Sequence, residues 1–417
     1  MPVRKKNKSH AHRLKMETAQ HQKQFINEVR DIIEKTAGSD VLRYIPQYEL
    51  EHLYKVRCHP VRVKAASGMS ISSGIIQFSN FMVTRLFKNT YIPIGLGTLT
   101  HLSLYSFFST GLTVMVYSLG LKEDAYPHAD EVKKVLAPLA ALIDSPVQDE
   151  ALDKYYDIMF LIAVFCCDIN EYLYTIEFHP ENIAKGILKS GVYSEIYKTQ
   201  LPKVKVLVEE RLRPAWHVGW CFANFEPPMT LVSVKSEDIY QPPGNMLDVY
   251  IQSHAINRLA ERLEGIDVGV LHFNIFNSLN QPKICRNKKG VLLFEYAIFK
   301  NKAGYFLGEV ADGKVILKTF LFLTNMGTPE ADRLQANTGL MKEDIIYLAI
   351  DKLSAFMHSD IAGNERIKQL FINSGCESLF KINKGHFVSS KGNEIGSKAE
   401  SIEKYLQLDT LPKRRKI

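Results

Sequence analysis

The chain has 417 residues, of which 46% are apolar and 23% are charged. These are the proportions of a folded globular protein, so a disordered chain is excluded. At this length we expect two or three domains, which also excludes a peptide or a single small module.

Basic residues concentrate at the two ends of the chain. Residues 1–24 hold seven lysines and arginines against one acidic residue, and residues 413–416 are all basic. Because the whole chain carries only +7, the part between the tails is acidic. Basic tails attract phosphate by releasing counterions, although such ends can also serve only for solubility. We predict a basic, disordered tail over 1–24 and a basic tail over 413–417, and the candidate nucleic-acid-binding residues are Arg4, Lys5, Lys6, Lys413, Arg414 and Arg415.

The cysteines indicate a reducing compartment. None of the six belongs to a CxxC pair, which is typical of reduced, buried thiols in a cytoplasmic protein. The N-terminus lacks the apolar core of a signal peptide, so we expect a cytoplasmic location. Histidines and cysteines show no zinc-ligand spacing, and we therefore predict no metal and no other cofactor.

The first half of the chain has mainly helical periodicity. Apolar residues recur every three or four positions over 13–36, 129–143, 149–167 and 183–192, which predicts amphipathic helices. We therefore expect a mainly helical domain over residues 25–225, with a surface that a protein partner could bind.

Residues 89–121 contain no Asp, Glu, Lys or Arg and are long enough to cross a bilayer. Pro93, Gly95, Gly97 and many hydroxyl residues favour buried helix and turn instead, because membrane insertion favours Leu, Ile, Phe and Val. A membrane-associated effector that inserts residues 92–121 remains an alternative.

The second half of the chain has a different residue pattern, with proline clusters followed by strand-like alternation. Two proline clusters predict a linker over 226–245, since proline neither continues a helix nor sits in a central strand. Alternation and periodicity then predict a strand over 247–251, helices over 254–263 and 268–279, and three antiparallel strands over 291–299, 304–310 and 314–323. An α+β domain over 246–336 and a helical region over 337–412 give an α+β protein.

The predicted helix that begins at His254 has two distinct faces. Apolar residues form one face, whereas His254, Arg258, Glu261 and Arg262 share the other. This run, His254-Ala255-x-x-Arg258-x-x-Glu261-Arg262, resembles a helix of small toxin domains of the RelE and BrnT type, within the barnase-like and RelE-like nuclease fold. The strand over 318–324 is similar to the late strand of those domains, where a threonine lines the site. The resemblance covers about residues 246–336, under a quarter of the chain.

The resemblance implies an RNA-binding protein that cleaves RNA without a metal through the RNA's own 2′-hydroxyl. His254 would transfer a proton, Arg258 and Arg262 would contact the phosphate, and Thr319 or Thr324 would orient a phosphate oxygen. Glu295 is a candidate second proton carrier. A non-enzymatic binding or scaffold protein, in which the RelE-like domain is inert, is the alternative reading.

Overall fold

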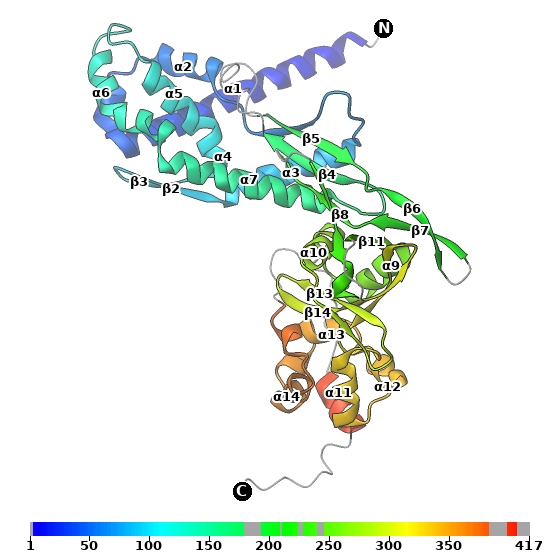
Figure 1. Ribbon diagram of the computed structural model, residues 1–417. Helices are drawn as coiled ribbons and strands as arrows, with labels where there is room; N and C mark the ends of the chain where they lie inside the picture. Colours follow the sequence, from blue (N-terminus) through cyan, green and yellow to red (C-terminus); the bar gives the residue numbers. More distant parts are fainter. Residues whose placement is uncertain are drawn as a thin grey trace. The chain divides into compact units, whose positions relative to one another are not determined.

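The computed structural model describes residues 3–178, 193–208, 211–223, 228–239, 246–382 and 398–406, with the backbone alone for residues 3–15 and 208 (Figure 1). The chain forms two compact units, each with its own helices and strands. Unit 1 comprises Met1–Ala163 and Thr175–Tyr197, and unit 2 comprises Val164–Tyr174 and Lys198–Ile417. The predicted α+β class is confirmed.

Unit 1 is built mainly from helices. A three-stranded sheet has the order β1-β5-β4, with β1 parallel to β5, and β2 and β3 form a separate antiparallel hairpin. The helices predicted over 129–143 and 149–167 are present as α6 and α7, and the helix predicted over 183–192 lies outside the described residues. The elements in chain order are α1 (Val3–Ala37), α2 (Gln47–Val56), β1 (Arg62–Ala65), α3 (Ser73–Asn89), β2 (Tyr91–Leu96), β3 (Leu99–Ser103), α4 (Leu104–Ser106), α5 (Leu112–Gly120), α6 (Ala129–Ala140), α7 (Pro146–Cys166), β4 (Leu173–Phe178) and β5 (Tyr193–Thr199).

The N-terminal tail that was predicted to be disordered over 1–24 is helical where the structure describes it, because α1 already begins at Val3. Its lysines, arginines, glutamines and alanines are strong helix formers. The same helix continues into a stripe in which Val29, Ile32 and Ile33 are buried, so tertiary packing holds its second half.

The uncharged segment 89–121 is not one continuous helix. It folds as the β2–β3 hairpin, the short α4, one π-helical turn over Phe107–Gly111, and α5. Pro93 lies in β2, and Gly95 and Gly97 have positive φ in the hairpin, a conformation that suits glycine. Among the helices that the structure describes, none is long and apolar enough to span a bilayer.

Unit 2 is organised around an eight-stranded sheet with the order β12-β13-β14-β15-β11-β7-β6, in which β10 also pairs with β11. Only the β11–β15 pair is parallel. The strands are β6 (Lys203–Val208), β7 (Arg211–His217), β10 (Ser233–Lys235), β11 (Met246–Gln252), β12 (Ile284–Arg286), β13 (Leu292–Ile298), β14 (Asn301–Ala311) and β15 (Lys314–Phe322). Strands β8 (Gly219–Cys221) and β9 (Met229–Leu231) form a separate pair.

Helices pack against this sheet to form one core. An aromatic cluster of Tyr296, Phe306 and Phe320 underlies α10, where the Tyr296 hydroxyl donates to the Leu271 carbonyl at 3.1 Å. Phe356 of α13 packs on Phe322 of β15. The helices are α9 (Ser253–Arg262), α10 (Val268–Asn280), α11 (Pro329–Thr338), α12 (Lys342–Tyr347), α13 (Ser354–Met357), α14 (Glu365–Asn373) and α15 (Lys398–Tyr405).

The boundaries of unit 2 differ from the predicted domains. The described part of 226–245 is not a linker, because β10 pairs with β11 and its Val234 is buried between the proline clusters. Strands β6 and β7 extend the sheet from within the predicted helical domain 25–225. Residues of the predicted helical region 337–412, such as Ile345 and Phe371, belong to the same hydrophobic core as β11 and β15.

Candidate functional site

One pocket of unit 2, of about 330 Å³, brings together all four predicted catalytic residues. His254, Arg258 and Arg262 come from α9, and Thr319 comes from β15. The pocket is completed by the end of β15, the turn that follows it, and α12. These further lining residues are Phe320, Leu321, Asn325, Met326, Lys342, Ile345 and Ile346.

The sheet topology explains why α9 and the end of β15 meet. Strands β11 and β15 run parallel, so their carboxyl ends lie at the same edge of the sheet, and α9 begins directly after β11. Ala255, Ile256 and Leu259 are buried against that sheet, as the sequence predicts. The opposite face of α9 therefore carries His254, which is exposed, and Arg258, which is half-buried.

A β-bulge precedes Thr319. The register between β14 and β15 pairs Leu307 with Thr319 and Gly308 with Leu317, which leaves Lys318 without a partner residue in the ladder. Strict alternation would place Thr319 on the same face as Leu317. Leu317 and Phe320 are three positions apart, so strict alternation would place them on opposite faces of the sheet. Both lie in the same core, which shows that the bulge breaks the alternation between them. Bulges commonly re-aim side chains beside functional sites.

The two arginines already have acidic partners. Arg258 Nη1 lies 2.6 Å from Glu261 Oε2 on the solvent side of α9. Arg262 donates from Nη1 to the carboxylate of Asp351, whose side chain is only 5% exposed. Arg262 therefore holds α9 to the segment after α12, and its charge is largely neutralised. Partial burial raises the pKa of Glu261, but the neighbouring arginines outweigh burial and lower it below its ordinary value.

The remaining polar groups of the pocket are His254, Lys342, Thr319 and Asn325. Within the described parts of the chain, neither the His254 imidazole nor the Lys342 ammonium has a hydrogen-bond or ion-pair partner. The described lining itself contains no carboxylate, although the carboxylates of Glu261 and Asp351 contact its two arginines. Sequence reasoning missed Lys342 and Asn325, because no local pattern shows that α12 and the turn after β15 close the pocket.

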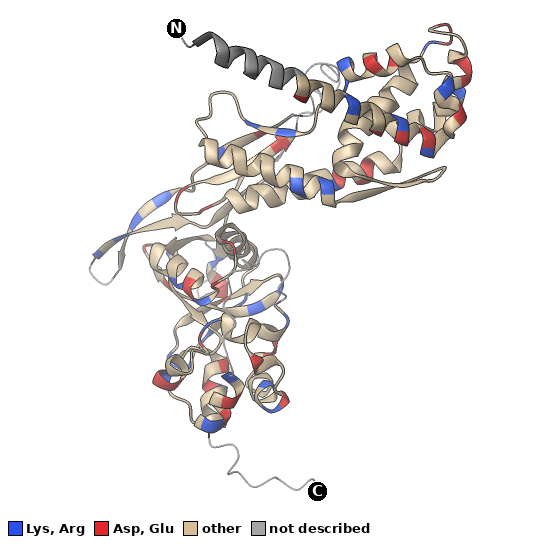
Figure 2. Ribbon diagram, turned by 180° about the vertical axis from the view of Figure 1, so that it is seen from behind, with Lys and Arg blue, Asp and Glu red and all other residues tan. Residues whose placement is uncertain are grey.

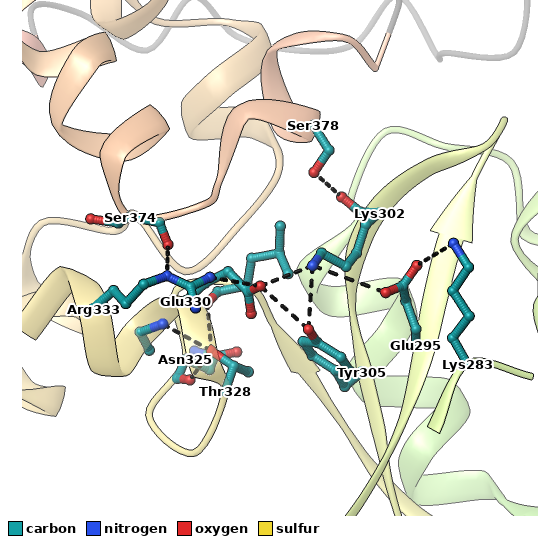
Figure 3. A network of polar contacts seen from close by, with 12 residues as sticks. Lys283, Glu295, Lys302, Tyr305, Asn325, Thr328, Glu330, Arg333, Ser374 and Ser378 are labelled. Carbon is teal, nitrogen blue, oxygen red and sulfur yellow. Dashed lines mark hydrogen bonds and ion pairs between the residues drawn. The ribbon is translucent and has the colours of Figure 1, made fainter. Parts of the chain in front are cut away.

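Two predicted participants lie elsewhere. Thr324 is buried and donates to the Ile350 carbonyl at 2.7 Å, so its hydroxyl is already used. Glu295 does not line the pocket, and its two oxygens lie 3.6 Å from Lys283 Nζ and 4.0 Å from Lys302 Nζ. Figure 3 shows Glu295 between Lys283 and Lys302 in a polar network that also includes Glu330. Both residues are thereby removed from the predicted set.

The predicted nucleic-acid-binding residues of the tails cannot be placed. The side chains of Arg4, Lys5 and Lys6 and the whole of Lys413, Arg414 and Arg415 lie outside the described residues. In the described parts, lysine and arginine are spread over both units, and on β6 and β7 they occur without an acidic residue in either strand (Figure 2). No group of three or more His, Cys, Asp or Glu side chains in these parts could hold a metal ion.

Comparison with family models, with curated proteins and with solved structures found no match to this chain.

Proposed function

We propose that unit 2 binds RNA and cleaves it without a metal at the pocket between α9, β15 and α12. The observation that carries the proposal is the convergence of His254, Arg258, Arg262 and Thr319 on one pocket whose described lining contains no carboxylate. The order strand, helix, helix and antiparallel strands, from β11 to β15, supports the resemblance to RelE-like domains as a proposal.

The proposed reaction forms a bond from the RNA 2′-oxygen to phosphorus and breaks the bond from phosphorus to the 5′-oxygen. The proton of the 2′-hydroxyl passes to a base, and the leaving 5′-oxygen gains a proton, which gives a 2′,3′-cyclic phosphate and a free 5′-hydroxyl. His254 is the only histidine in the described lining, so it takes one proton role and water takes the other.

Charge stabilisation is divided among the cations. Lys342 lines the pocket and has no acidic partner in the described part of the chain. Arg258 can turn from the exposed Glu261 to a phosphate at little cost, since surface ion pairs are weak. Arg262 acts mainly as a positioning residue, because its guanidinium is held by Asp351. Thr319 and Asn325 offer hydrogen bonds to phosphate oxygens.

The test is cleavage of a labelled RNA in the presence of a chelator. We expect a 2′,3′-cyclic phosphate product, no cleavage of the same oligonucleotide with 2′-deoxyribose, and a loss of about 100-fold or more in His254→Ala. Lys342→Ala should lower the rate as well. His21→Ala and Lys289→Ala, which change exposed residues that do not line the pocket, are the matched controls and should cleave like wild type. Cleavage that persists in His254→Ala contradicts the proposal.

A second candidate function is RNA binding without cleavage. It is favoured by the pairing of both arginines with carboxylates, which leaves Lys342 as the one lining cation without an ion-pair partner among the described residues. Salt-sensitive binding of RNA that is weakened by Lys342→Ala, with no product formed, would support this function and exclude the ribonuclease.

A further inference from the structure

Helices α2 and α5 of unit 1 (Figure 1) line a second cavity, of about 400 Å³. On each helix the lining residues are spaced by three or four positions, so each helix turns one face toward the cavity. They are Glu49, His52, Leu53 and Val56 on α2, and Thr113, Val116, Tyr117 and Gly120 on α5. All of them belong to unit 1, and we call this space the unit 1 cavity.

Two helices that face each other normally close the space between them. Helix axes usually pack about 8–10 Å apart, and protein interiors hold few voids larger than a water molecule. Here α5 is bonded to segments on either side of the cavity. The Cys58 amide donates to the Thr113 hydroxyl at 3.0 Å, and the hydroxyls of Tyr117 and Tyr126 lie 2.8 Å apart. Gly120 adds no side chain, and no heavy atom lies within 4 Å of its Cβ position.

The walls of the unit 1 cavity are mainly hydrocarbon, supplied by Leu53, Val56, Val116 and Leu121. The one hydroxyl among them that could compete for a ligand, that of Thr113, is already used. It accepts from the Cys58 amide and donates to the Ser109 carbonyl at 2.8 Å. A molecule that enters this space therefore exchanges water for apolar contacts over most of its surface.

The charged residues of the lining favour neither sign of charge on a ligand. Glu49 and Lys122 both line the unit 1 cavity, so their charges offset each other and an ion of either sign meets one like charge. An ion would also lose hydration against the apolar walls, which is costly without a dedicated partner. The lining thus fits an uncharged molecule.

The tyrosine pair supplies one hydrogen bond for such a molecule. Two hydroxyl groups carry two hydrogens, and the bond between Tyr117 and Tyr126 uses one of them, which leaves the other to be donated. The volume sets the size of the molecule. An apolar cavity of about 150 Å³ holds benzene, so about 400 Å³ suits a molecule of roughly twice that size.

We propose that the unit 1 cavity binds an uncharged, mainly apolar small molecule that carries one hydrogen-bond acceptor. Its body lies against Leu53 and Val116, and its acceptor receives the hydrogen that the tyrosine pair does not use. This site belongs to unit 1 and the proposed RNA pocket belongs to unit 2, so either proposal can fail without the other.

The experiment is isothermal titration calorimetry of the full chain with 4-butylphenol at pH 7. We expect one site with a Kd below about 1 mM, which is reasonable for a ligand of this size. The charged analogues 4-butylbenzoate and 4-butylbenzylamine should bind at least about 10-fold more weakly, because each brings an ion to the apolar walls. No binding of 4-butylphenol, or equally tight binding of a charged analogue, would overturn the proposal.

Filling the space places the ligand in the unit 1 cavity. Val116→Phe adds volume there and should weaken binding of 4-butylphenol at least about 10-fold. Val135→Phe makes the same change on α6 at a residue that is 44% exposed and does not line the cavity, so it should bind like wild type. Gly120→Leu is a second filling variant, since its Cβ position is open, and circular dichroism checks the fold of all three. Wild-type binding by the folded filling variants would overturn the site.

A last variant tests the hydrogen bond. Tyr117→Phe removes one hydroxyl of the pair and should weaken binding of 4-butylphenol about 2- to 12-fold, the range for one hydrogen bond. Butylbenzene, which has no hydroxyl, should bind to Tyr117→Phe as it binds to wild type. If the variant weakens both ligands equally, the tyrosine pair does not donate to the ligand and the acceptor is struck from the proposed chemistry.

Discussion

Lys302 and Glu330 form an ion pair that ties α11 to the sheet of unit 2, with Lys302 Nζ 2.9 Å from Glu330 Oε1. The same oxygen accepts from Arg333 Nη2 at 3.1 Å and from the Tyr305 hydroxyl at 3.3 Å (Figure 3). Burial lowers the pKa of Lys302, but the hydrogen bond and charge of Glu330 outweigh it and raise the pKa above the ordinary lysine value. Burial and the charge of Glu330 raise the pKa of Tyr305 to about 12.

The two partners of this pair differ in burial, which predicts unequal effects of their removal. The Glu330 side chain is 3% exposed and that of Lys302 is 25% exposed. Lys302→Met leaves a buried carboxylate with less compensation, and we expect a loss of about 3 kcal/mol in the free energy of unfolding. Glu330→Gln leaves cations that can reach water and should cost about 1 kcal/mol. Urea denaturation of both variants measures the difference, and equal losses would contradict this reading.

His272 predicts a loss of stability in mild acid. Its side chain is buried on α10, and Nδ1 accepts from the Ile169 amide at 2.9 Å, which requires the neutral ring. Burial lowers the pKa of His272 to about 4, although Asp168 at 3.9 Å acts in the opposite direction. Because the unfolded chain binds this proton near pH 6.5, the stability is fully present above that pH and is lost as the pH falls toward 4.

The expected loss from His272 is about 3 kcal/mol between pH 7 and pH 4. His272→Asn keeps an acceptor near the position of Nδ1 but does not titrate, so its stability should depend less on pH over this interval. Urea denaturation of both proteins at several pH values is the measurement. The same pH dependence in the variant and in wild type would exclude His272 as its source.

Local patterns were enough to predict α9 and its polar face. Ala255, Ile256 and Leu259 are spaced for one buried face, and their burial fixes the direction of His254 and Arg258. The strands β13 to β15 were also predictable, because Asp312 and Gly313 form the turn between alternating segments. Such patterns indicate how residues close in sequence are arranged on one helix, strand or turn.

The features that could not be predicted depend on residues far apart in the chain. Arg262 and Asp351 are separated by 89 positions, and no local pattern indicates that this carboxylate neutralises the arginine. The strand β10 lies between proline clusters, yet it pairs with β11 because Val232 and Val234 can be buried there. The bulge at Lys318 shifts Thr319 relative to Leu317, which a strict two-residue period does not show.

Because Arg262 is held by Asp351, we expect Arg262→Ala to lower the free energy of unfolding more than it weakens RNA binding. The variant leaves Asp351, 5% exposed, without its main cation, and we expect a loss of about 3–5 kcal/mol. Asp351→Asn keeps an oxygen acceptor and should cost about 1–2 kcal/mol. Urea denaturation distinguishes the two. A stable Arg262→Ala protein with wild-type unfolding would show that the ion pair is not needed for folding.

Gly269 packs α10 against the end of α7 with no room for a side chain. A Cβ at this position would lie 1.7 Å from the Val164 carbonyl oxygen and 3.2 Å from that of Cys167. These atoms belong to the backbone, so a change of rotamer cannot relieve the overlap, and we expect Gly269→Ala to lower the free energy of unfolding by about 3 kcal/mol or more.

Gly74, in the first turn of α3, has no heavy atom within 4 Å of its Cβ position. Gly74→Ala should therefore stabilise by about 0.5–1 kcal/mol, because alanine loses less entropy in a helix. Urea denaturation of both variants tests this contrast, and a Gly269→Ala protein as stable as wild type would show that α10 can move away from α7.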